Sequence, residues 1–154
     1  MKTRTLTLLT LAILASLLLG AYTFNALSAP KELKLKAKWK PAAYLINAPV
    51  PDPWKVEIYF APPRPVQDIN ATTLRLEQTI MWDEEHPPYM HTLKDRLVVS
   101  YHGADVLGAA LLKMTHTGPG TYVVYLEITG KLYDNTPFRG TGSITLVIDS
   151  ELPP

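Results

Sequence analysis

Two alternating stretches near the C-terminus constrain the fold of this chain more than any other feature. In residues 122–132 and 138–148, most apolar side chains fall on even-numbered positions: Tyr122, Val124, Leu126, Ile128, Leu132, Phe138, Ile144, Leu146 and Ile148. Period-two alternation is typical of strands that bury one face. Two such strands with a short connection predict an antiparallel hairpin. The requirement that both apolar faces point the same way then restricts the length of its turn.

Parity predicts a three-residue turn in this hairpin. A two-residue loop would pair even positions with odd ones and send the apolar faces to opposite sides of the sheet. With Tyr133, Asp134 and Asn135 as the loop, Leu132 lies opposite Thr136 and the two faces coincide. Such a loop ends in a left-handed residue, and Asn is the residue best tolerated there after Gly. Asn135 is therefore predicted to be a turn residue, and Asp134 to have no catalytic role.

Composition excludes several classes of protein. The chain has 154 residues, 47% of them hydrophobic, which is enough for one domain with a core. It has no cysteine, which excludes disulfides, thiolate chemistry and Cys-type zinc sites. The 14 prolines occur mostly in clusters and favour β-structure with rigid loops. After Pro30 there are 13 basic and 14 acidic residues (13 − 14 = −1), which argues against nucleic acid as a partner.

The first thirty residues are interpreted as an export signal. A basic start, "MKTR", precedes residues 6–24, a run of 19 residues without charge. Ala26-Leu27-Ser28 matches a signal-peptidase site, but the run is also long enough to span a bilayer. The segment is thus either cleaved or kept as a membrane anchor through residues 6–24, and the protein is secreted or anchored, in both cases extracytoplasmic. The expected domains are 1–30 (signal or anchor), 31–150 (β-domain) and 151–154 (tail).

The rest of the chain reads as strands joined by turns. Six strands are predicted, at 32–39, 53–60, 72–80, 96–102, 122–132 and 138–148, with one helical turn near 68–71 and a short helix at 103–114. Residues 82–95 form a polar, proline-broken loop. This pattern favours a mostly β protein with the architecture of an antiparallel β-sandwich.

Three stretches carry a family resemblance: "VQDINATTLRLE", "DRLVVSYHGADVLGAALL" and "VYLEITGKLYDNTPFRGTGSITLVI". Together they resemble an immunoglobulin-like β-sandwich module of exported archaeal and bacterial surface proteins, whose last hairpin reads L-x-D-G-T-x-F-x-G. Asn135 stands at the glycine of that motif. The Asp-rich segment usual before the L-x-V strand of that family is replaced by "DEEHPPYMHTLKD". The resemblance implies a structural or adhesive module without catalysis.

The 82–95 loop and the first strand hold the candidate binding residues. The loop residues Asp83, Glu84, Glu85 and Asp95 are hard oxygen ligands suited to calcium, and His86 and His91 suit a transition metal. The alternative is a solvated loop, because three of these carboxylates are consecutive and the double proline prevents a compact calcium loop. Trp82 and Tyr89 are candidates for sugar stacking, and Asn70 begins an N-x-T glycosylation sequon.

Lysines alternate along the first strand. Lys34, Lys36, Lys38 and Lys40 should occupy its solvent face, with Leu35 and Trp39 among the inward residues. Their functional interpretation is a basic patch for anionic lipid or polysaccharide, and the alternative is a solubilising surface.

These observations predict a non-enzymatic, exported module for binding, adhesion or assembly. The chain holds no G-x-S-x-G, H-E-x-x-H or glycine-rich phosphate motif, and no catalytic residue or cofactor is assigned. The expected partner is a protein, a polysaccharide or a second copy of the chain. The alternative is a carbohydrate- or calcium-binding accessory domain that uses the 82–95 loop.

Overall fold

The computed structural model describes residues 31–60, 65–91, 95–116 and 118–149. The predicted signal or anchor helix (1–30) and the predicted tail (151–154) lie outside these residues. The chain divides into two units, Met1–Lys31 and Glu32–Pro154, and the second holds all the elements below. Within the described ranges, no helix is both long enough and apolar enough to cross a membrane.

The second unit is mostly β, with one short α-helix, as the sequence predicts. Its strands are β1 (Leu33–Lys40), β2 (Ala43–Leu45), β3 (Trp54–Phe60), β4 (Ile69–Leu76), β5 (Tyr89–His91), β6 (Arg96–Tyr101), β7 (Gly120–Leu132) and β8 (Pro137–Ile148). The 3-10 turn η1 (Val66–Asp68) precedes β4, and the helix α2 (Gly103–Leu112) connects β6 to β7. The strands β2 and β5 were not predicted, and each has only three residues.

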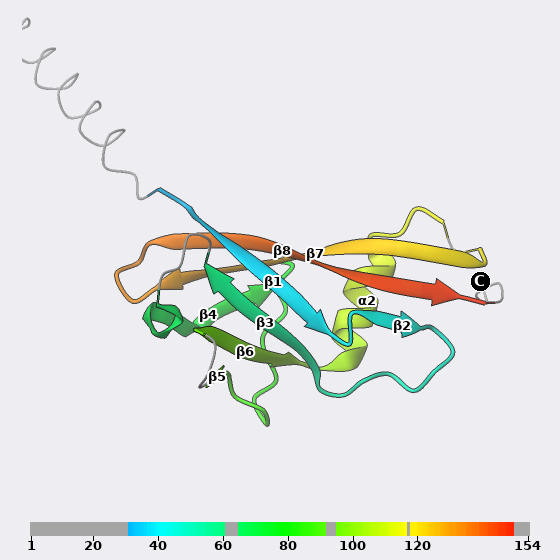
Figure 1. Cartoon of the computed structure of the whole chain (residues 1–154), viewed down its shortest axis with the longest axis horizontal. Coiled ribbons are helices and arrows are strands. Elements are labelled where there is room, and N and C mark those ends of the chain that lie inside the picture. Colours follow the sequence, from blue (N-terminus) through cyan, green and yellow to red (C-terminus); the bar gives the residue numbers. More distant parts are fainter. Residues whose placement is uncertain (1–30, 61–64, 92–94, 117, 150–154) are drawn as a thin grey trace, which may run out of the picture. The chain divides into compact units, whose positions relative to one another are not determined.

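The strands form one curled, mixed sheet (Figure 1). Its order is β4-β7-β8-β1-β3-β6-β5, and β2 also pairs with β8. The expectation of a wholly antiparallel arrangement is wrong at β8, because β1 and β2 both run parallel to it. Glycine permits this close approach: a Cβ on Gly140 would lie 2.3 Å from the Leu35 carbonyl oxygen. The missing side chains at Gly140 and Gly142 therefore make room for β1.

The β7–β8 hairpin has the predicted register. Gly130 lies opposite Phe138 and Ile128 opposite Gly140. The Leu132 N–H donates to the Thr136 carbonyl at 3.0 Å, and the Asn135 N–H donates back to the Leu132 carbonyl at 3.0 Å. Asn135 has φ 65°, the left-handed conformation that the parity argument requires.

The fourth strand differs from its predicted range of 72–80. It ends at Leu76 because Glu77 and Gln78 have φ of 49° and 67°, and the chain turns back so that Ile80 bridges to Leu76. Its pairing with β7 also shifts register between Asn70 and Arg75. Ile80 lies at an even-numbered position like Leu74 and Leu76, although position 78 between them is Gln, so periodicity alone did not reveal where the strand ends.

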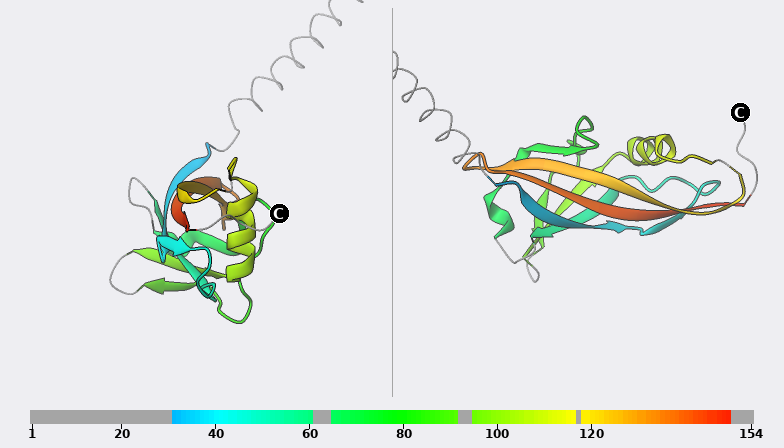
Figure 2. Two further views of the ribbon diagram at one scale, coloured as in Figure 1. Left: turned by 90° about the vertical axis from the view of Figure 1, so that its right-hand side faces the viewer. Right: turned by 90° about the horizontal axis from the view of Figure 1, so that it is seen from above.

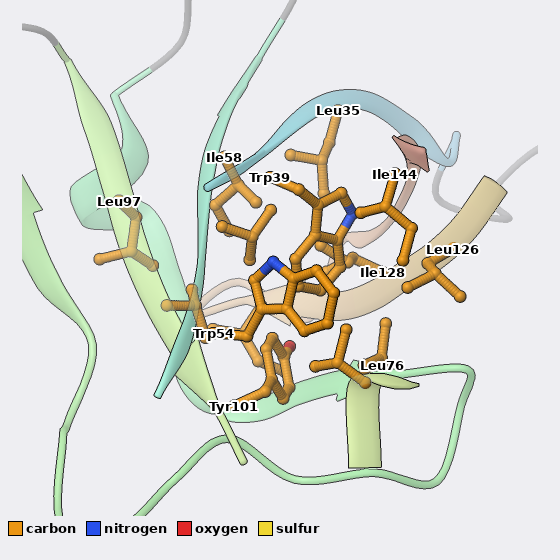
Figure 3. Packing of buried hydrophobic residues seen from close by; sticks show 14 of the residues in the cluster. Leu35, Trp39, Trp54, Ile58, Leu76, Leu97, Tyr101, Leu126, Ile128 and Ile144 are labelled. Atoms are coloured by element: carbon orange, nitrogen blue, oxygen red, sulfur yellow. The ribbon is translucent and has the colours of Figure 1, made fainter. Parts of the chain in front are cut away.

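Aromatic residues from β1, β3 and β6 fill the centre of the core (Figure 3). Trp39 and Trp54 pack edge to face with ring centroids 6.5 Å apart, and Tyr101 lies 6.1 Å from Trp39. All three are at most 1% exposed. Seen end-on, the strands wrap around this core and α2 lies along one side (Figure 2). The inward face of the sheet is therefore committed to packing, which leaves its outward face for contacts with other molecules.

Candidate functional site

Alternation along β1 and β3 places lysines on the outward face of the sheet. We call Lys34, Lys36, Lys38 and Lys55 the lysine face; all four are exposed. Lysines two residues apart on one strand are separated by about 7 Å. Lys55 extends the row onto β3, where it lies opposite Lys40. The result is a linear array of cations along one strand with a branch on its neighbour.

The carboxylates near this face are engaged by other cations. Lys40 and Arg96 both pair with Glu57. Arg139, opposite Lys34 in the register, pairs with Glu32 at 3.2 Å and with Glu127 at 3.4 Å. Among the described residues, no ion pair involves any member of the lysine face. Its positive charge therefore remains uncompensated by nearby carboxylates.

Hydroxyl groups border the lysine face. Thr141 lies opposite Lys36 on β8, Ser143 follows on the same outward side, and both are exposed. Tyr59, opposite Lys36 on β3, carries the Arg96 guanidinium over its ring at 4.7 Å. The large exposed apolar side chains of the described surface include no residue of β1 or β3. The face thus offers charge and hydrogen-bonding groups without an apolar anchor.

Glu57 is the exception on the outward side of β3, because it is only 3% exposed. The hydrogen bond from Lys40 is the main cause that lowers its pKa to about 2, and Arg96 adds to this effect against the opposing effect of burial. Since Lys40 belongs to β1 and Arg96 to β6, the Glu57 carboxylate joins three neighbouring strands, β1, β3 and β6. Glu57 therefore holds this part of the sheet together beneath the exposed lysines.

A second polar cluster lies where the 82–95 loop meets the start of α2. Asp83 is 2% exposed and its Oδ2 lies 2.6 Å from His86 Nδ1. Its Oδ1 accepts from the Glu85 N–H at 3.0 Å and lies 3.5 Å from His102 Nε2. The hydrogen bond with His86 is the main cause that lowers the pKa of Asp83. The Asp83 side chain is thus used to shape its own loop.

Asp52 connects this cluster to the helix. Its Oδ1 accepts a 3.1 Å hydrogen bond from the Gly103 N–H and lies 3.8 Å from His102 Nδ1. Gly103 needs to be glycine, since a Cβ there would lie 2.0 Å from the Pro51 carbonyl oxygen. A groove of about 450 Å³ runs past the cluster and is lined by residues 80–85, His102 and Asp105. Contacts from Asp52 and Asp83 thus hold both of their loops against the N-terminus of α2.

The predicted metal ligands do not come together. Asp83 is buried and hydrogen-bonded, whereas Glu84 and Glu85 are exposed. Asp95 lies elsewhere, where its Oδ1 accepts from the Val66 N–H at 3.4 Å. His91 is in β5, across from Arg96. Within residues 31–60, 65–91, 95–116 and 118–149, no group of three or more His, Asp or Glu is arranged to hold a metal ion.

The other predicted contact residues have different environments. Trp82 packs against the core, and its Nε1–H donates to the Ala71 carbonyl at 3.0 Å, so it is a packing residue rather than a free platform. Tyr89 is 50% exposed on β5 and stays a candidate for ligand contact. Asn70 is half-buried, and its side-chain oxygen accepts from the Thr72 N–H at 3.2 Å and hydroxyl at 2.7 Å. Its glycosylation stays a prediction.

Sequence reasoning missed Glu57, Asp52 and His102. Glu57 sits on the predicted outward side of its strand, and its burial arises from cations on two other strands. Asp52, Asp83 and His102 meet only through the tertiary fold, and no spacing in the sequence marks them.

Comparison of the chain with known protein families, curated proteins and solved structures found no match.

Proposed function

We propose that this protein is an exported, non-enzymatic module with an immunoglobulin-like fold that binds a linear anionic polysaccharide at the cell surface. The observation that carries the binding proposal is the lysine face, with its row of unpaired cations on an exposed strand. Such a row suits a chain-like partner whose negative groups recur along its length. The bordering hydroxyls of Thr141 and Ser143 suit sugar hydroxyls.

Strand order supports the immunoglobulin-like part of the proposal. One half of the sheet runs β1-β3-β6-β5 and the other runs β8-β7-β4. Lettered A to G along the chain, without β2, these halves have the orders A-B-E-D and G-F-C of an immunoglobulin sandwich. The parallel contact between β1 and β8 joins the two halves. The curled sheet is then a sandwich whose first strand links its two layers.

A polysaccharide is favoured over a membrane surface. Peripheral membrane binding combines cationic side chains with apolar ones that enter the acyl layer. The exposed large apolar side chains lie on other elements, for example Val123 and Tyr125 on β7 and Leu112 on α2. The partner is therefore expected to be recognised by charge and hydrogen bonding alone.

Binding to defined polymers tests this function. The full chain, kept in mild detergent, should bind dextran sulfate and polygalacturonate but not neutral dextran. Replacing all four residues of the lysine face by glutamine should weaken binding at least about tenfold, whereas arginine at the same four positions should preserve it, because charge is retained. Equal binding by the two variants, or a larger loss of binding to anionic lipid vesicles than to either polymer on glutamine replacement, contradicts the proposal.

Export has its own test. The N-terminus of the protein isolated from its cells should either begin near Ala29, which indicates cleavage, or retain residues 6–24 in a membrane fraction, which indicates an anchor. Recovery of the chain with residues 6–24 intact from the cytoplasmic fraction would contradict the export proposal and leave the polymer-binding measurement unaffected.

A further inference from the structure

The first part of β7 has an unpaired edge. β7 pairs with β8 along its whole length, but its pairing with β4 is confined to Ile128–Leu132. The Glu127 carbonyl faces the β4 side, where it accepts from the Glu77 N–H at 2.9 Å. Because N–H and C=O groups alternate sides along an antiparallel strand, Thr121, Val123 and Tyr125 direct theirs to that same side. No strand of the described chain lies opposite these three residues.

The β4 and β5 edges of the sheet are protected, whereas in residues 121–125 of β7 only the Tyr125 carbonyl accepts a hydrogen bond from a side chain of the described residues, that of Lys113. At the β4 edge, the carbonyls of Ala71, Thr72 and Leu74 accept hydrogen bonds from the Trp82 and Arg75 side chains. β5 has three residues and follows Pro87 and Pro88. By contrast, the segment "TYVVY" (121–125) is uncharged, contains no proline and pairs with β8 without a register shift. Proteins protect sheet edges that must stay unpaired, so an unprotected edge indicates pairing.

Side chains at this edge are apolar and open to solvent. Val123 is 57% and Tyr125 62% exposed, and Leu112 at the end of α2 is 89% exposed. A groove of about 420 Å³ lies between residues 113–115 and residues 122–125. Lys113 Nζ donates to the Tyr125 carbonyl at 3.1 Å, at one end of the segment. The backbone groups of Thr121 and Val123 lie beyond this contact, toward the start of β7.

We propose that two copies of the chain associate through antiparallel pairing of their 121–125 edges. The segment complements itself: with Val123 on the two-fold axis, the two Val123 residues exchange both hydrogen bonds, and Thr121 of each copy lies opposite Tyr125 of the other. The apolar side chains on the outward side then cover one another. An isologous contact of this kind closes as a dimer. The lysine faces, on other strands, remain available in both copies.

Site-directed crosslinking tests this pairing, because the native chain has no cysteine. Residues paired through two hydrogen bonds on antiparallel strands have Cα atoms about 5.5 Å apart, within the range that a disulfide spans. The full-length Val123→Cys chain in mild detergent should form disulfide-linked dimers under mild oxidation. The matched Tyr133→Cys chain, altered at a 70% exposed turn position, should remain largely monomeric. Equal crosslinking of the two chains overturns the proposal.

A charge at the same position gives an independent readout. Val123→Lys places two like charges opposite each other on the axis and should weaken dimerisation at least about tenfold in analytical ultracentrifugation, relative to Tyr133→Lys. Since Val123 is exposed, its folded state should tolerate lysine, and circular dichroism checks this. A parent chain that stays monomeric at all concentrations, or a Val123→Lys chain that dimerises as well as the parent, overturns the pairing.

Discussion

The two sides of β1 have opposite roles. Leu35 and Trp39 point inward and are 5% and 1% exposed, whereas Lys34, Lys36 and Lys38 point outward into solvent. Packing on the inward side has little tolerance for change, while exposed lysines contribute little to stability. One strand thus contributes separately to the core and to the proposed binding surface. Changes on the outward side can therefore test function without unfolding the protein, with Glu57 as the exception.

The largest effect is expected on the inward side. Trp39→Ala should lower the free energy of unfolding by about 3–5 kcal/mol, because it removes an indole packed against Trp54 and Tyr101. The adjacent Lys38→Ala should change it by less than about 0.5 kcal/mol. Urea denaturation of the two variants measures the difference. Similar losses at both positions would show that the two sides are not distinct.

Glu57→Gln should have an intermediate effect on the outward side. It removes a buried carboxylate shared by Lys40 and Arg96 and should lower the unfolding free energy at pH 7 by about 1–3 kcal/mol. The cost is limited because the Lys40 side chain is 54% exposed and stays hydrated after the loss of its partner. A change as small as that of Lys38→Ala, measured by the same denaturation, would show that Glu57 belongs with the other outward residues.

The same carboxylate predicts a pH dependence. Its pKa is lowered from 4.5 to about 2 in the folded protein, so its stabilising contribution is complete above pH 4.5 and is lost as the pH falls toward 2. The difference in unfolding free energy between the parent and Glu57→Gln should therefore shrink across this range. A difference that stays constant from pH 5 to pH 2 would contradict the ion-pair assignment.

The turn that aligns the inward sides of β7 and β8 should respond to backbone changes. Asn135→Val should cost about 1–2 kcal/mol, because a β-branched residue is strained at φ 65°. Asn135→Gly should be neutral or stabilising by up to about 1 kcal/mol. Denaturation midpoints decide between these outcomes, and a valine variant as stable as the parent would contradict the assigned turn.

Removal of the Tyr101 hydroxyl from the core should have a small effect on stability, opposite in sign to the loss expected for Trp39→Ala. The buried Tyr101 hydroxyl has no hydrogen-bond partner among the described protein atoms, and burial raises the pKa of Tyr101. Tyr101→Phe should therefore leave stability unchanged or raise it by up to about 1 kcal/mol. A clear loss in thermal unfolding would mean that this hydroxyl has a partner, such as a buried water molecule.

The sequence predicted the parts of the fold that depend on local alternation. The β7–β8 register, the left-handed Asn135 and the inward positions of Trp39 and Trp54 followed from period two and parity. The end of β4 did not, because Glu77 and Gln78 adopt positive φ, which their residue types do not signal. The parallel pairing of β1 with β8 is a long-range contact that no local pattern encodes.

The candidate site was predicted to a similar extent. Alternation gave the exposed lysines of β1, but Lys55 joined them only through the β1–β3 register. The number of carboxylates in the 82–95 loop led to the prediction of a metal site. In the structure, Asp83 instead contacts His86 and His102 and holds the loop to α2, and it is separated from Asp95. The many charged residues of this loop thus correctly indicated a polar segment, but the tertiary structure determines which group each side chain contacts.

The salt dependence of polymer binding tests the central claim most directly. Each lysine that contacts a polyanion releases counterions, so the logarithm of the affinity falls linearly with the logarithm of the salt concentration. For dextran sulfate, replacement of the four lysine-face residues by glutamine should reduce the magnitude of this slope by about 3, with an unchanged urea midpoint. A slope equal to that of the parent would show that the lysine face does not bind the polymer.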